Sequence, residues 1–276
     1  MPVIFHKMHG AGNDFVLIDL RQQNFTLDAR RAALIADRKR GIGCDQILVL
    51  KDARNAENTA RYEIWNADGS LAGQCGNGAR CIGLYLSRQG KLVNSDFSLE
   101  SPSGIISLRI SGDGEFEVDM GVPEFESSKV PLTLSALNGM VQIESPWGIL
   151  ELAAVSMGNP HALMLCEELE DSEIAQIGPF VSAHPGFPEG CNVGFAKILD
   201  RGKIQLRVYE RGVGETLACG SGACAAVAIL KQRGLVDSVV DVILTGGHLV
   251  IKWPGSGQSL HMKGPAKYVF KGKVNG

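Results

Sequence analysis

The sequence predicts an α+β protein of two pseudo-symmetric domains that arose by internal duplication, each with a sheet wrapped around one enclosed helix. Three observations lead to this fold class. Motifs of the first half recur in the second, short apolar runs alternate with turn residues, and each half has a helix that follows the same cysteine-glycine motif. We place the domains at residues 1–120 and 121–264, and we expect the tail, residues 265–276, to pack back on the first domain.

The duplication is clearest around two cysteines. Cys75-Gly76-Asn77-Gly78-Ala79 recurs as Cys219-Gly220-Ser221-Gly222-Ala223, an offset of 219 − 75 = 144 residues. Further matches follow in the same order: Asn13 with Asn159 (159 − 13 = 146), Gln46 with Asn192 (192 − 46 = 146) and Tyr62-Glu63 with Tyr209-Glu210 (209 − 62 = 147). Because order and spacing are kept, we infer that the two halves share one plan.

The predicted secondary structure agrees with a repeated unit. Short apolar runs at 16–18, 47–50, 105–108 and 249–251 are bounded by Gly, Asp, Asn or Pro, as strands usually are. The helix after each cysteine motif is expected to stop at Gly90 in the first half and at Gly234 in the second, since glycine is a common C-terminal cap. Residues 224–230 are apolar on every side of the second helix, which predicts that a sheet encloses it. The stretch 124–147 is rich in turn residues and has no counterpart in the first half.

Composition excludes several classes of protein. The chain has 276 residues, 21% of them charged and 45% hydrophobic, and its net charge is −3. These values argue against disorder and against a nucleic-acid surface, so we expect a small-molecule partner. No apolar run approaches the roughly 20 residues that span a bilayer, and the first residues do not resemble a signal peptide. We therefore expect a cytoplasmic protein without a membrane partner, and its seven cysteines should be reduced thiols.

The cysteine motifs suit proton transfer. A cysteine at the start of a helix lies beside unpaired backbone N–H groups at the positive end of the helix dipole. We expect these groups to lower the thiol's pKa from about 8.5 towards neutrality and to bind a substrate carboxylate. Two pseudo-symmetric domains would bring two such thiols together across an interdomain cleft. One thiolate would remove the proton of an α-carbon while the other thiol returned a proton to the opposite face, which inverts the carbon without a cofactor.

Polar residues in glycine-rich loops would support this reaction. They are Asn13, Gln46, Asn66, Asn159 and Asn192, with Glu210 and Arg211 after a strand. Arg211 suits a second carboxylate, because a guanidinium binds carboxylates with two parallel hydrogen bonds. Glu210 suits an ammonium group or the orientation of a thiol. His161, two residues after Asn159, suits the tuning of a thiol's pKa.

Several longer strings resemble the diaminopimelate epimerase family. They are residues 8–15, 66–70, 74–81, 157–161, 209–212 and 218–222, and together they extend over nearly the whole chain. The resemblance implies an enzyme that interconverts L,L- and meso-diaminopimelate without pyridoxal phosphate, in lysine and peptidoglycan biosynthesis. It also implies two barrel-like, mostly antiparallel domains, each around a central helix, and a homodimer.

The resemblance also implies roles for individual residues. Cys75 and Cys219 would be the acid/base pair, with Cys75 the proton donor and Cys219 the acceptor in the direction from L,L to meso. The amides of Gly76-Asn77 and Gly220-Ser221 would hold the reacting carboxylate. The remaining substrate contacts would be Asn13, Gln46, Asn66, Asn159, Asn192, Glu210 and Arg211, with His161 and Glu210 adjusting the thiols.

Two cysteines depart from the family's usual pattern. Cys44 precedes Asp45-Gln46, and Cys191 precedes Asn192, so each would place an additional thiol near the cleft. Whether these thiols make the protein sensitive to oxidation is left open by the sequence. The other three, Cys81, Cys166 and Cys224, are interpreted as buried small hydrophobic residues.

Alternative functions remain. The nearest is a proline-type or other amino-acid racemase of the same duplicated fold, ranked second because different residues would follow its cysteines. A phenazine-pathway isomerase would lack one of the two cysteines. From other classes, a thiol–disulfide oxidoreductase or a cysteine hydrolase would use one cysteine with His161, although CxxC is missing, and a non-catalytic amino-acid-binding protein would need no thiol. Without HExxH, GxxxxGK or a complete dinucleotide fingerprint, we predict no metal and no cofactor.

Overall fold

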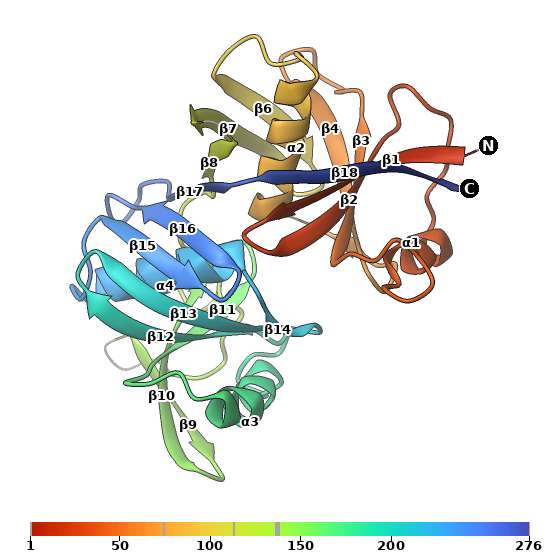
Figure 1. The fold of residues 1–276 in the computed structure, drawn as a ribbon. Coiled ribbons are helices and arrows are strands. Elements are labelled where there is room, and N and C mark those ends of the chain that lie inside the picture. Colours follow the sequence, from red (N-terminus) through yellow and green to blue (C-terminus); the bar gives the residue numbers. More distant parts are fainter. Residues whose placement is uncertain (1, 74, 113, 136–138, 276) are drawn as a thin grey trace. The chain divides into compact units, whose positions relative to one another are not determined.

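The computed structural model describes residues 2–73, 75–112, 114–135 and 139–275 (Figure 1). The chain divides into two compact units. Unit 1 is Met1–Asp119 with Lys263–Gly276, and unit 2 is Met120–Met262. In its described residues, each unit combines a mostly antiparallel sheet with helices.

Unit 1 is built around the helix α2. Its elements are β1 (Pro2–Gly10), β2 (Asn13–Asp19), α1 (Ala29–Ala36), β3 (Gln46–Lys51), β4 (Ala60–Asn66), β5 (Leu71–Ala72), α2 (Gly76–Arg88), β6 (Asp96–Ser101), β7 (Gly104–Gly112), β8 (Glu115–Asp119) and β18 (Lys267–Asn275). The pairs β1–β2, β3–β4, β6–β7 and β7–β8 are antiparallel, whereas β2–β3 and β4–β6 are parallel. The last strand, β18, pairs with β1, as the blue and red ribbons in Figure 1 show.

Unit 2 repeats this arrangement around the helix α4. Its elements are β9 (Met140–Ser145), β10 (Gly148–Ser156), β11 (Pro160–Leu165), α3 (Asp171–Ser182), β12 (Asn192–Asp200), β13 (Lys203–Glu210), β14 (Gly214–Thr216), α4 (Gly220–Gln232), β15 (Val239–Leu244), β16 (Gly247–Lys252) and β17 (His261–Pro265), which ends in unit 1. The pairs β10–β11, β12–β13 and β15–β16 are antiparallel, and β11–β12 and β13–β15 are parallel. The predicted duplication is therefore confirmed strand by strand.

The register of the strands identifies equivalent residues. Phe15 lies opposite Gln46 in unit 1, and His161 lies opposite Asn192 in unit 2, which supports the predicted offset of 146. The Tyr-Glu match at offset 147 is wrong. Asn66 lies opposite Gln46, and Tyr209 lies opposite Val193, which places Glu210 opposite Asn192. Asn66 is thus the counterpart of Glu210, whereas the sequence had suggested Glu63, three residues earlier. Because three is an odd number, the mistaken register would turn every side chain to the other face of the sheet.

The stretch 124–147 also has more structure than its turn residues indicated. It includes β9, which pairs antiparallel with β10. In unit 1 the corresponding place beside β1 is taken by β18, which comes from the far end of the chain. A comparison of the two halves in linear order could not find this counterpart.

Both predicted helices have the expected ends and surroundings. Cys75 and Cys219 are the N-cap residues of α2 and α4, and glycines with positive φ follow both helices, Gly90 at 63° and Gly234 at 74°. The helix α4 packs against β10, β11, β12, β13 and β16, and α2 packs against β1, β2, β3, β7, β8 and β18. None of the helices in the described ranges is long and apolar enough to cross a membrane.

Gly83 allows α2 to approach the sheet closely. A Cβ atom at this position would lie 2.9 Å from two ring carbons of Phe116 and 3.1 Å from Phe97. We expect Gly83→Ala to lower the free energy of unfolding by about 1–2 kcal/mol, because overpacking outweighs alanine's better helix propensity. Urea unfolding measures this difference. Ser87→Ala, an exposed change in the same helix, is the control and should alter stability by less than about 0.5 kcal/mol; equal stabilities of the two variants would contradict the expected crowding.

Candidate active site

In unit 1, strand ends bring three of the expected site residues to one edge of the sheet. Asn13 is the first residue of β2 and Gln46 the first of β3, and these strands are parallel, so both residues lie at the same edge. Asn66 is the last residue of β4, antiparallel to β3, and lies opposite Gln46. Gln46 Nε2 donates a hydrogen bond to Asn66 Oδ1 at 2.9 Å, which fixes the two side chains together.

Cys75 joins this edge from the start of α2. Its backbone is extended, and its Sγ accepts a hydrogen bond from the Gly78 N–H at 3.4 Å, as expected for a helix N-cap. Sγ lies 3.9 Å from Asn13 Oδ1. A Cβ atom at Gly78 would lie 2.9 Å from a methyl group of Leu48 on β3, so this glycine lets the helix start approach the strand. We name Cys75, Asn13, Gln46, Asn66 and Asn77 half-site 1.

Unit 2 assembles its own set of residues in the same way. His161 on β11 lies opposite Asn192, the first residue of β12, and Glu210 is the last residue of β13. Asn192 Oδ1 accepts a hydrogen bond from the Arg211 N–H at 2.9 Å. His161 Nε2 lies 3.0 Å from Oδ1 of Asn159. We give the name half-site 2 to the set Asn159, His161, Asn192, Glu210, Arg211, Cys219 and Ser221.

The thiol of Cys219 differs from the expectation. Its side chain is buried, with Sγ 3.6 Å from the hydroxyl of Ser221. Burial first, and then the negative charge of Glu210, raise the pKa of Cys219 well above its usual range. Hydrogen bonds from Ser221 and the Gly222 N–H act in the opposite direction but do not outweigh them. The predicted lowering of this pKa is therefore wrong, because desolvation disfavours the thiolate more than the helix start favours it.

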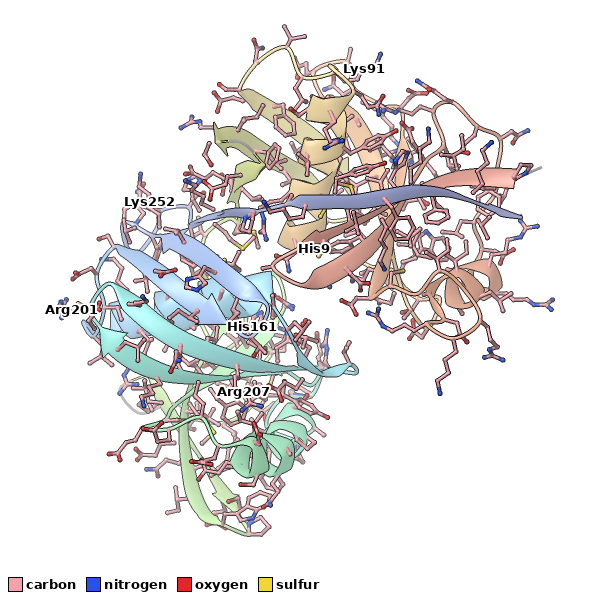
Figure 2. All side chains as sticks on the ribbon, in the orientation of Figure 1. His9, Lys91, His161, Arg201, Arg207 and Lys252 are labelled. Atoms are coloured by element: carbon pink, nitrogen blue, oxygen red, sulfur yellow. The ribbon has the colours of Figure 1, made fainter. Side chains whose placement is uncertain are left out.

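His161, labelled in Figure 2, is a neutral imidazole near neutral pH. It is buried, and burial, followed by the positive charge of Arg211, lowers the pKa of His161 to about 3. A neutral ring contributes no full positive charge to a nearby thiolate.

The two half-sites share a plan but differ in charge. Asn66 in unit 1 corresponds to Glu210 in unit 2, whose Oε1 accepts a 2.5 Å hydrogen bond from the hydroxyl of Thr216. On the helices, Arg80 corresponds to Cys224 at the offset of the cysteine motifs, 224 − 80 = 144. Arg80 is fully buried and donates to Asn77 at 2.7 Å. The sequence interpretation missed Arg80, although a charged residue within a helix expected to be enclosed is a signal that could have found it.

Comparison with known proteins identifies the family. A family model described as "Diaminopimelate epimerase" matches residues 5–126 and 153–269. The chain belongs to this family. Similar relatives named diaminopimelate epimerase include that of Xylella fastidiosa strain M12, 48% identical over 98% of this chain and 96% of the relative. Another, from Chromobacterium violaceum, is 44% identical over 99% of both chains.

Solved structures agree with the predicted fold class. A hydroxyproline epimerase from Agrobacterium vitis superposes with a TM-score of 0.73 over 99% of this chain and 92% of that chain, at 16% identity. A phenazine biosynthesis protein from Bacillus anthracis gives a TM-score of 0.68 at 14% identity, over 100% of this chain and 99% of that chain. At such identities the likeness shows the fold alone. The predicted fold class and the resemblance to diaminopimelate epimerases are both confirmed.

The two cysteines that are unusual for the diaminopimelate epimerase family lie in the interior of their units. Cys44 and Cys191 are 2% and 0% exposed, and burial raises the pKa of each thiol to about 12. Cys191 Sγ donates to the Val181 carbonyl oxygen at 3.7 Å. Since thiolates rather than thiols react with alkylating agents and oxidants, neither thiol is poised for such chemistry.

We expect Cys44 and Cys191 to resist alkylation in the native protein. Iodoacetamide at pH 8, followed by peptide mass spectrometry, should leave both unmodified, whereas the same reaction in urea should modify both. Modification of either residue in the folded protein would show that its burial is not maintained.

Within the described residues, no group of three or more His, Cys, Asp or Glu side chains is arranged to hold a metal ion.

Proposed function

We propose that this chain interconverts L,L- and meso-2,6-diaminopimelate by a cofactor-independent transfer of protons between two cysteines and one α-carbon. The observation that carries the proposal is the pair of equivalent helix starts, each with an N-cap cysteine, in a member of the diaminopimelate epimerase family. The proposal requires the two half-sites to act on one substrate molecule.

Both cysteines start as thiols in this mechanism, and Cys219 has a neighbouring carboxylate that can take its proton. Cys219 is a thiol near neutral pH, so it must lose a proton before it can act as a base. The Glu210 carboxylate is within hydrogen-bonding reach of Cys219 and accepts this proton. The Cys219 thiolate then takes the α-proton, and the resulting carbanion takes a proton from the Cys75 thiol on the opposite face. One turnover leaves Cys219 as a thiol, Cys75 as a thiolate and Glu210 protonated, so the reverse reaction exchanges the roles of the two cysteines. Before another turnover in the same direction, Glu210 loses its proton and Cys75 regains one.

The remaining polar groups bind the substrate in this proposal. The backbone amides of Gly76-Asn77 and Gly220-Ser221 lie in the first turns of α2 and α4, where anions bind favourably, and would hold the reacting carboxylate. Contacts with the rest of the substrate would come from Asn13, Gln46, Asn66, Asn159, Asn192, Glu210 and Arg211. The guanidinium of Arg211 is exposed and donates to the Glu189 carbonyl oxygen, so it would turn towards a carboxylate when substrate binds.

The biological setting belongs to the same proposal. An enzyme of this activity would act in lysine and peptidoglycan biosynthesis in the cytoplasm, without a cofactor, metal, nucleic acid or membrane. The names of the relatives support the pathway, and the family resemblance supports a homodimer.

Exchange of hydrogen for deuterium at the α-carbon tests the proposal directly. In heavy water without added cofactor, we expect the enzyme to incorporate deuterium at Cα of diaminopimelate, as followed by NMR or mass spectrometry. Proline and hydroxyproline serve as comparison substrates, because a racemase of proline type shares this fold. Absence of exchange with diaminopimelate, or faster exchange with proline, would overturn the assignment.

A further inference from the structure

A chain of hydrogen bonds runs through half-site 1 and ends on two residues that have no assigned role. Arg80 Nη2 donates to Asn77 Oδ1 at 2.7 Å, Asn77 Nδ2 donates to Asn13 Oδ1 at 3.2 Å, and Asn13 Nδ2 donates to Asp45 Oδ2 at 2.9 Å. All four residues belong to unit 1. The chain therefore connects a buried cation to a carboxylate by way of two carboxamides.

The two ends decide which way both carboxamides face. A carboxamide has nearly the same shape in either orientation, so its hydrogen-bond partners fix the positions of its oxygen and nitrogen. A guanidinium only donates, so Asn77 turns its oxygen to Arg80 and its NH2 group to Asn13. An ionised carboxylate only accepts, so Asn13 turns its NH2 group to Asp45. Asn13 Oδ1 is then the atom that faces both Asn77 and Cys75.

Both ends of the chain are held in place. Arg80 is fully buried and also donates from Nε to the Pro265 carbonyl oxygen at 3.3 Å. At the other end, Asp45 accepts hydrogen bonds from the guanidinium of Arg38 at 2.7 Å and from the Asp14 N–H at 3.0 Å. Charge-assisted bonds of this kind are stronger than bonds between neutral groups, so the ends constrain the two carboxamides rather than following them.

The orientation of Asn13 matters to Cys75. Asn13 Oδ1 lies 3.9 Å from Sγ, where it accepts from a thiol S–H but would repel a thiolate. We propose that Arg80 and Asp45 are positioning residues that lock the Asn13 carboxamide with its oxygen towards Cys75, and so keep Cys75 protonated as the proton donor of the resting enzyme. The inference deepens the proposed function, on which its kinetic meaning rests.

Unit 2 has no copy of this chain, because the residues equivalent to Asn77 and Arg80 are Ser221 and Cys224. The thiol of Cys219 has a carboxylate, Glu210, as its neighbour instead. A carboxylate can take a proton, whereas an amide oxygen only accepts a hydrogen bond. The two half-sites therefore assign the resting enzyme's donor to unit 1 and its base to unit 2.

Two substitutions of Asp45 test the proposal in the enzyme without substrate. Asp45→Ala removes the acceptor of Asn13 Nδ2 and leaves the carboxamide held only by the neutral NH2 group of Asn77, so that it turns its own NH2 group to Sγ more often, which favours the thiolate. Asp45→Asn removes the same charge but keeps an oxygen that can accept from Asn13 and from the Asp14 N–H. The side chain of Asp45 is 43% exposed, so neither change should prevent folding, and circular dichroism verifies this.

The measurement is the rate of iodoacetamide alkylation of Cys75 as a function of pH, with Cys219 followed in the same sample by peptide mass spectrometry. At pH values below the midpoint of the wild-type alkylation profile, we expect alkylation of Cys75 in Asp45→Ala to be about threefold to tenfold faster than in the wild type. The reason is that the hydrogen bond between Asn13 and Sγ then favours the thiolate instead of the thiol. Asp45→Asn should stay within about twofold of the wild type, and Cys219 should not change in either variant.

Equal acceleration in both variants would show an effect of charge alone, and no acceleration in Asp45→Ala would show that the carboxamide is not held by Asp45; either result overturns the proposal. Arg80→Lys keeps a buried donor for Asn77 and should leave the Cys75 profile within about twofold of the wild type, and a large change there would also overturn it. Because the readout needs no substrate, its result is independent of the exchange experiment with diaminopimelate.

Discussion

Cys75→Ala and Cys219→Ala are each expected to abolish epimerisation while the protein remains folded. Each variant lacks one partner of a two-sided proton transfer, and a positioned acid or base contributes about 10²–10⁴-fold to a rate. Loss of one sulfur atom should cost only about 1 kcal/mol of stability, because alanine fits either position without a clash. Chiral chromatography of the diaminopimelate isomers gives the activity, and circular dichroism with thermal unfolding gives the fold.

A control variant separates catalysis from packing. Cys224→Ala removes a fully buried thiol from α4, five residues after Cys219, and should reduce stability without reducing turnover by more than about twofold. Full activity in either Cys75→Ala or Cys219→Ala would rule out the two-thiol mechanism. Equal loss of activity in Cys224→Ala would attribute the effect to packing of the helix.

Glu210→Gln should have opposite effects on two measurements of the same site. The carboxylate raises the pKa of Cys219, so its replacement by a neutral amide should lower that pKa and speed alkylation of Cys219 at any pH below the midpoint. Epimerisation should nevertheless slow by about 10²-fold, because the variant lacks the group that accepts the thiol proton. A more reactive thiol in a slower enzyme would distinguish a chemical role from a structural one.

Glu168→Gln is a matched control for this variant. Glu168 is an exposed carboxylate of unit 2 that pairs with Lys197, and its replacement removes the same charge elsewhere in the unit. We expect both the alkylation profile of Cys219 and the rate of epimerisation to stay within about twofold of the wild type. Unchanged epimerisation in Glu210→Gln would remove Glu210 from the mechanism.

Much of the fold followed from the sequence because a duplication records equivalent positions twice. The matched cysteine motifs predicted both enclosed helices, and the offset of 146 correctly paired Gln46 with Asn192. The Tyr-Glu match failed because Tyr62-Glu63 resembles Tyr209-Glu210, although the true counterpart of Glu210 is Asn66, three positions after Glu63. Only the register of β3 with β4 reveals this shift. The sequence led us to expect the tail against the first domain, but it did not identify β1 as the partner of β18, since residues from opposite ends of the chain make this pairing.

The expected site residues followed from motifs, whereas their electrostatics did not. A helix start lowers a thiol's pKa only when burial and neighbouring charges permit it, and the sequence states neither. Cys219 shows this, because its burial and the charge of Glu210 both come from tertiary structure. Arg80 was missed for a related reason, since an arginine is interpreted as a surface residue until its burial is known.

The pairing of β18 with β1 has a consequence for the protein while it is being made. Synthesis proceeds from the N-terminus, so β1 leaves the ribosome long before its neighbour β18, which follows all of unit 2 in the sequence. All of unit 2 is complete by residue 262, before the final strand of unit 1 exists. The nascent chain therefore carries one finished unit and one with an open strand edge, and that edge must be kept from other chains until β18 has been made and pairs with β1.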